Sequence, residues 1–119
     1  MLLLKKISEI RNRYYKLLLI VGKHNSGKTT ILKKIQQEMQ CPLFNLNYEI
    51  SNKLHDVPRN DWDMHIDSVI GELSSVTDQQ ILIDNIEILF SSEFDLNPLQ
   101  ILKRLSRTHL VIASWPGSY

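Results

Sequence analysis

The chain has 119 residues, 43% of them hydrophobic, and a formal net charge of +1, which is typical of a single globular domain. This composition argues against disorder, collagen-like repeats and disulfide scaffolds. The even balance of 14 basic and 13 acidic residues gives no sign of a nucleic-acid partner. Cys41 is the single cysteine, and no segment approaches the roughly 18 apolar residues of a membrane span. We therefore expect one domain over residues 1–119, in the reducing cytoplasm and away from membranes.

The first part of the chain predicts a helix, a strand and a second helix. Apolar residues spaced by three and four indicate an amphipathic helix over residues 2–14. Residues 16–21 are apolar from Leu17 onward and precede Gly22, a pattern that is typical of a strand covered on both faces. Helical spacing returns at Lys28 and stops before Pro42.

The middle of the chain begins with a second predicted strand over residues 43–46. Residues 47–61 are polar and contain Pro58, so we expect a long irregular connection there. Apolar residues at helical spacing then predict a helix over 62–73.

The last part of the chain predicts two more strands with a helix between them. A third strand covers residues 81–83 and ends on Asp84. Asn97 and the proline after it are favoured at a helix start, so they predict a helix that continues to Leu105. A fourth strand follows over 110–113. Buried strands that alternate with helices predict a layered α/β fold, in which right-handed crossovers join parallel strands.

Residues 22–29 lie between the first strand and its helix and match the phosphate-loop pattern G-x-x-x-x-G-K-[ST] at every fixed position. The two glycines allow a tight curl in which backbone N–H groups point at phosphate oxygens, and the helix presents its positive end to the same anion. Lys28 is expected along the β- and γ-phosphates, and the Thr29 hydroxyl on Mg²⁺. The predicted nucleotide-binding residues are Gly22, His24, Asn25, Ser26, Gly27, Lys28, Thr29 and Thr30.

The third strand ends in an acid, which is where a phosphate-loop protein holds the hydration shell of its magnesium ion. We therefore predict that Asp84, together with Thr29, forms the metal side of an ATP and Mg²⁺ site. An aspartate that only forms a turn at the strand end is the alternative.

One strand lies between these two motifs and one follows the acid, an arrangement that resembles the additional-strand, catalytic-glutamate division of P-loop ATPases, which includes the AAA-type proteins. The resemblance implies a three-layer P-loop NTPase fold with sheet order first, fourth, third, second. We expect residues 1–119 to lack the fifth strand and lid that the division normally adds. In that division a glutamate follows the acid and polarises the attacking water, but here the residue is Asn85. An amide orients water without accepting its proton.

Two other positions are catalytic candidates by the same resemblance. Glu87 lies two residues beyond Asn85 and is a candidate replacement for the missing base, with a solvated strand-end residue as the alternative. Ser114 falls where the division places a polar residue that contacts the γ-phosphate or the attacking water. A turn before Pro116 is the alternative for that serine.

A wider set of segments is similar to the BrxF-like family of small P-loop proteins from type 3 bacteriophage-exclusion (BREX) systems. The similarity implies a cytoplasmic nucleotide-binding component of a phage-defence complex, whose partners are other defence subunits or further copies of itself. It implies no known reaction step. The segments that carry it are Gly22 to Thr29, Leu46-Asn47, Ile83 to Phe90, Asn97-Pro98-Leu99, Leu105-Ser106-Arg107 and Ala113 to Gly117.

Three functions fit these motifs. The first is an ATP-binding and slowly hydrolysing switch that acts with larger partners. The second is a nucleotide-dependent assembly subunit without turnover, which Asn85 favours. The third is a small-molecule kinase, although no arginine-rich lid follows the third strand.

Overall fold

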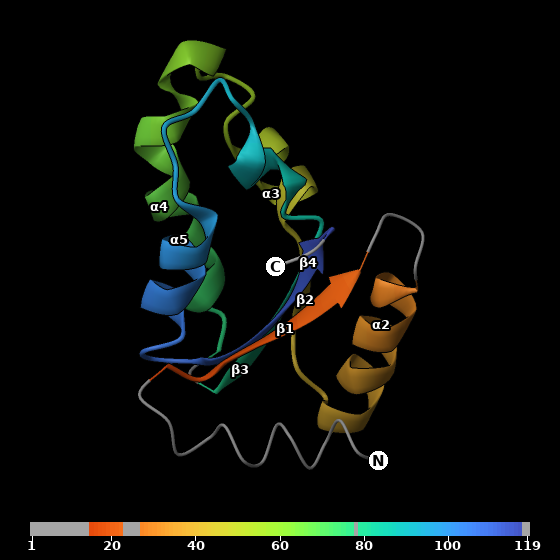
Figure 1. Ribbon diagram of the computed structural model, residues 1–119. Helices are drawn as coiled ribbons and strands as arrows, with labels where there is room; N and C mark the ends of the chain where they lie inside the picture. The colour runs from red at the N-terminus through yellow and green to blue at the C-terminus, as the bar shows by residue number, and fades with distance from the viewer. Residues whose placement is uncertain (1–14, 23–26, 78, 118–119) are drawn as a thin grey trace.

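A computed structural model describes residues 15–22, 27–77 and 79–117 (Figure 1). Its centre is a parallel sheet in which the strands follow the order β1-β4-β3-β2. This is the order that the sequence resemblance implies. The strands are β1 (Leu17–Gly22), β2 (Leu43–Asn45), β3 (Gln80–Asp84) and β4 (Leu110–Pro116).

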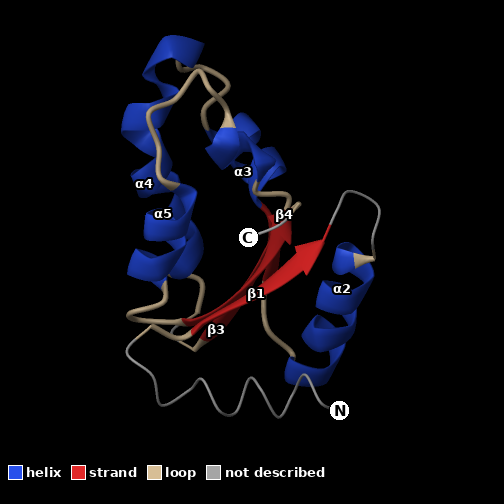
Figure 2. Cartoon of the chain, in the orientation of Figure 1, coloured by secondary structure: helices blue, strands red, loops and turns tan. Residues whose placement is uncertain are grey.

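Helices cover both faces of the sheet, with α2 (Lys28–Met39) on one face and three α-helices on the other (Figure 2). The face opposite to α2 carries α3 (Leu46–Lys53), α4 (Trp62–Ser74) and α5 (Pro98–Leu105), with short 3-10 helices η1 (Arg59–Asp61) and η2 (Glu87–Phe90) beside them.

No helix among the described residues is long and apolar enough to cross a membrane.

The alternation of side chains along each strand divides the core into two clusters. Leu82 and Ile112 face α2 and pack with Leu32 and Ile35 in the smaller cluster. Their strand neighbours, Ile83 among them, face α3, α4 and α5 in the larger one. In β3, a residue therefore lies on the α2 face when it is an even number of positions from Leu82. In β4, the same holds for positions counted from Ile112.

The strongest sequence patterns are confirmed. Strand β1 has the predicted bounds within one residue at each end, and helix α2 begins at Lys28 as predicted and ends at Met39, before Pro42. Helix α5 begins at Pro98, and the Asn97 side chain accepts a hydrogen bond of 3.1 Å from the backbone N–H of Gln100, as expected of an N-cap. The helix predicted over residues 2–14 lies outside the described residues.

The irregular connection predicted over residues 47–61 is wrong, because this segment contains α3 and η1. The Asn45 side chain caps α3 by accepting the Tyr48 N–H at 3.0 Å. Leu46, Ile50 and Leu54 follow at spacings of four and are all buried in the larger cluster. All three of these apolar residues have polar neighbours on both sides, which hid the helical stripe. Strand β2 consequently ends at Asn45 rather than at residue 46.

Side-chain contacts hold the segment between α3 and α4 against its neighbours. Trp62 donates its indole N–H to the Val57 carbonyl at 2.9 Å and stacks on Phe94 at 6.4 Å between ring centroids. The Arg59 guanidinium lies 4.5 Å from the centre of the Trp62 ring and pairs with Glu93 at 3.2 Å. These contacts join η1 to the chain that follows η2.

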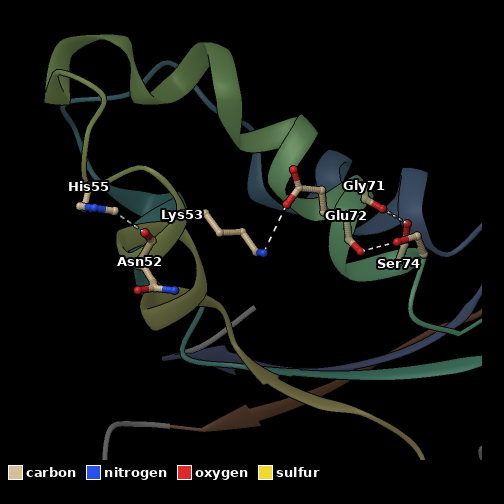
Figure 3. A network of polar contacts seen from close by, with 7 residues as sticks. Asn52, Lys53, His55, Gly71, Glu72 and Ser74 are labelled. Atoms are coloured by element: carbon tan, nitrogen blue, oxygen red, sulfur yellow. Dashed lines mark hydrogen bonds and ion pairs between the residues drawn. The ribbon is translucent and has the colours of Figure 1, made fainter.

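Helices α3 and α4 are also joined by an ion pair of 3.3 Å between Lys53 and Glu72 (Figure 3). Glu72 is largely exposed, so solvent screens the pair and its contribution to stability is small. Apolar packing in the larger cluster therefore holds the two helices together.

Cys41 lies in the smaller cluster, on the α2 face of the sheet. Burial raises the pKa of its thiol, which therefore remains protonated at neutral pH and packs as a small apolar residue.

Candidate functional site

The predicted site lies where β1, β3 and β4 end, beside the first turn of α2. Strand β1 ends at Gly22 and α2 begins at Lys28. Gly27 precedes the helix with φ of 91°, a left-handed conformation that glycine adopts without steric cost. The intervening His24, Asn25 and Ser26 lie outside the described residues, as do the phosphate contacts predicted for them.

Lys28 and Gly22 meet at the end of β1. The Lys28 ammonium donates a hydrogen bond to the Gly22 carbonyl. The same carbonyl accepts the backbone N–H of Gly117 at 2.9 Å, which ties the chain beyond β4 to the end of β1. A positive charge is therefore held at the carboxyl end of the sheet, where the phosphate-loop pattern places its lysine.

Thr29 and Asp84 are brought into direct contact. The Thr29 hydroxyl donates a hydrogen bond of 2.6 Å to Oδ2 of Asp84, across 55 positions of sequence. Thr29 belongs to the first turn of α2, and Asp84 is the last residue of β3. Thr30, predicted to touch the nucleotide, is exposed in the same turn of α2.

The other oxygen of the Asp84 carboxylate is also engaged. Oδ1 accepts the Ser114 hydroxyl at 2.6 Å and the backbone N–H of Asn85 at 2.9 Å. Asp84 is 6% exposed and Ser114 is 2% exposed, so these bonds replace the water that a buried carboxylate has lost. Ser114 lies within β4, which continues to Pro116 instead of ending at residue 113 as predicted.

Asn85 has a backbone conformation that restricts which residues fit there. Its φ is 55°, in the left-handed region where asparagine and glycine are most easily accommodated. Its carbonyl accepts the backbone N–H of Asn47 at 3.1 Å, near the start of α3. This conformation gives a physical reason for an amide at the position where the resemblance implies a glutamate.

The left-handed conformation leads to an unusual order of stability among variants of Asn85. We expect Asn85→Gly to be at least as stable as Asn85→Ala, and Asn85→Glu to lose about 1 kcal/mol relative to asparagine, because L-residues pay roughly that cost at positive φ. Urea unfolding of the three variants measures the order.

Ser68 provides the matched control, because it is exposed within the regular helix α4. There the usual order applies, and Ser68→Ala should be more stable than Ser68→Gly by about 1 kcal/mol. The same alanine-over-glycine order at Asn85 would contradict the assigned backbone conformation.

Glu87, the proposed substitute base, is the first residue of η2 and its side chain is exposed. It lies two positions after Asn85, the positive-φ residue that directly follows β3. An exposed carboxylate is compatible with both interpretations of Glu87, as a solvated residue and as a base that contacts a bound ligand. Neither is therefore favoured by its position.

Comparison of the chain with family models, curated proteins and solved structures gives no match.

The donor atoms at the site fit a magnesium ion better than a transition metal. Thr29 and Asp84 offer hydroxyl and carboxylate oxygens, which are hard ligands of the kind that Mg²⁺ prefers. Within the described parts of the chain, no group of three or more His, Cys, Asp or Glu side chains could hold a metal. A cation at Thr29 and Asp84 would complete its shell with phosphate oxygens and water, as Mg²⁺ commonly does.

Proposed function

We propose that this protein binds ATP with Mg²⁺ at the carboxyl ends of β1, β3 and β4. The observation that carries the proposal is the 2.6 Å contact between Thr29 and Asp84. These are the two residues that separate sequence motifs assign to the metal, and the fold brings them together from 55 positions apart. The Lys28 ammonium at the end of β1 supplies the positive charge that the phosphates require.

Each residue of the site has a task that follows from its chemistry. Lys28 exchanges its bond to the Gly22 carbonyl for charge-assisted bonds to phosphate oxygens, which are stronger than bonds to a neutral acceptor. The first turn of α2 directs backbone N–H groups and a positive dipole end toward the anion. Thr29 and Asp84 hold the metal ion, which neutralises phosphate charge when bound.

Hydrolysis by the isolated chain is expected to be slow, because Asn85 cannot take a proton from water. A general base typically accelerates such a step by about 10²- to 10⁴-fold. This feature favours a second candidate function, a nucleotide-dependent assembly subunit without turnover. In either case, the resemblance to BREX proteins extends the proposal to a subunit of a phage-defence complex.

Incubation of the purified protein with γ-labelled ATP tests these functions together. We expect saturable Mg·ATP binding with phosphate release about 10²- to 10⁴-fold below the median enzyme rate of about 10 s⁻¹. Label that moves to a small-molecule acceptor would support a kinase instead. Fast release by the isolated chain would contradict the argument from Asn85, and failure to bind any nucleotide would refute the proposed function.

A further inference from the structure

The hydrogen bond between Ser114 and Asp84 gives Ser114 a more specific task than the sequence predicts. Both side chains are buried, and the Ser114 hydroxyl donates to Oδ1 of Asp84 at 2.6 Å. A serine hydroxyl carries one proton. Because that proton is donated to Asp84, it is not available for a phosphate oxygen or an attacking water.

The sheet itself creates this contact. Strands β3 and β4 are paired with Ile83 opposite Ala113, so Asp84 and Ser114 follow at the same level on neighbouring strands. Asp84 lies two positions after Leu82, and Ser114 lies two positions after Ile112. Since Leu82 and Ile112 face α2, the side chains of Asp84 and Ser114 also lie on the α2 face, beneath Thr29. Ser114 is also paired in register with Ile20 of β1. Its position is thus fixed by pairing with β1 on one side and by the hydrogen bond to Asp84 of β3 on the other.

The two oxygens of the Asp84 carboxylate have different surroundings as a result. Oδ1 accepts bonds from Ser114 and from the Asn85 N–H, whereas Oδ2 accepts the Thr29 hydroxyl on the side of α2. Rotation of the carboxylate plane away from this setting would break the short bond to the buried serine. The serine therefore holds one oxygen in the sheet and directs the other toward Thr29.

We infer that Ser114 is a positioning residue that orients Asp84 for the metal ion, and not a residue that contacts the γ-phosphate. The inference rests on the proposed function, because it concerns the Mg²⁺ of the bound nucleotide. Partners that orient metal-binding groups in this way typically change metal affinity by about 10- to 100-fold when they are removed.

Calorimetric titration of Ser114→Ala with ATP, once in Mg²⁺ and once in EDTA, tests the inference. We expect the affinity in Mg²⁺ to fall by about 10-fold, with the affinity in EDTA unchanged. Ser114→Thr should restore the Mg²⁺ affinity, because it returns a hydroxyl to the same carbon. Thermal unfolding of each variant monitors the fold, and Ser114→Cys, which keeps the volume with a weaker donor, repeats the test if alanine impairs folding.

Ser106 supplies a matched control. It is also a buried serine whose hydroxyl makes a 2.7 Å bond, here to the Lys103 carbonyl. Its own carbonyl accepts the N–H of Lys16, directly before β1 and at the opposite end of the sheet from Ser114. Ser106→Ala should therefore leave both affinities at the wild-type values.

A double-mutant cycle separates action through Asp84 from direct contact with the nucleotide. If Ser114 acts through the carboxylate, Ser114→Ala should have little further effect on Mg²⁺ affinity in an Asp84→Asn background. An equal loss in Mg²⁺ and EDTA, or a full effect in the Asp84→Asn background, would show direct contact and overturn the inference. Wild-type affinity in Ser114→Ala would overturn the inference alone. Absence of binding by the wild type would overturn the proposed function as well.

Discussion

Replacement of Lys28 by alanine is expected to weaken Mg·ATP binding by about 30-fold or more, with the fold intact. The ammonium lies at the end of β1, where it donates to the Gly22 carbonyl, and a bound triphosphate offers it a charged acceptor. Loss of one partner of such a charged pair typically costs about 2 kcal/mol or more, which corresponds to this factor. Calorimetric titration of both proteins measures the difference.

Lys33→Ala is the control for this substitution. Lys33 is an exposed lysine of the same helix, so its removal changes the net charge equally without touching the end of β1. We expect near wild-type affinity for that variant, and unchanged circular dichroism for both. Equal losses from the two substitutions would indicate a general charge effect and would remove Lys28 from the site.

Asp84→Asn is expected to lower Mg²⁺-dependent ATP affinity by about 10- to 100-fold. The amide keeps the shape of the side chain and retains an acceptor for the Ser114 or Thr29 hydroxyl, but it lacks the negative charge that attracts the cation. Titration in Mg²⁺ and in EDTA should therefore show a defect only in Mg²⁺. A defect of the same size in EDTA would assign Asp84 a structural role.

Asp84→Ala adds a loss of stability to that defect. It removes the acceptor of both the Thr29 and Ser114 hydroxyls, and Ser114 is almost fully buried. A buried hydroxyl left without a partner costs about 1–3 kcal/mol, so Asp84→Ala should unfold at lower urea concentration than Asp84→Asn. Equal stability of the two variants would mean that water replaces the carboxylate.

Much of the fold is predictable from the sequence, because most of its strands and helices have a clear local signal, such as an apolar run or a favoured helix-start residue. Strand β1 is a continuous apolar run, and the Asn97-Pro98 pair marks the start of α5. Helix α3 was missed because a short helix of eight residues exposes most of its side chains, so polar composition outweighed its buried stripe. Sheet order was available only from the resemblance to a known division, since strand pairing is a long-range property.

The site was predictable to the extent that local motifs define it. Lys28, Thr29 and Asp84 were identified from spacing and strand ends, and the structure brings Thr29 and Asp84 into contact. The donation from Ser114 depends on the pairing of β3 with β4, and the left-handed backbone of Asn85 depends on how the chain leaves β3. A single sequence carries no local signal for either feature.

The bond from the Asn47 N–H to the Asn85 carbonyl sets a limit on communication between the candidate site and the protein surface. It links the residue after Asp84 to the first turn of α3, whose Tyr48 is 62% exposed. A single backbone hydrogen bond contributes a net stability of about 1 kcal/mol. Coupling carried by this bond alone would therefore change the affinity of a protein bound to α3 by no more than about fivefold. A larger effect of nucleotide on that affinity requires a change in η2 or in the packing of α3 as well.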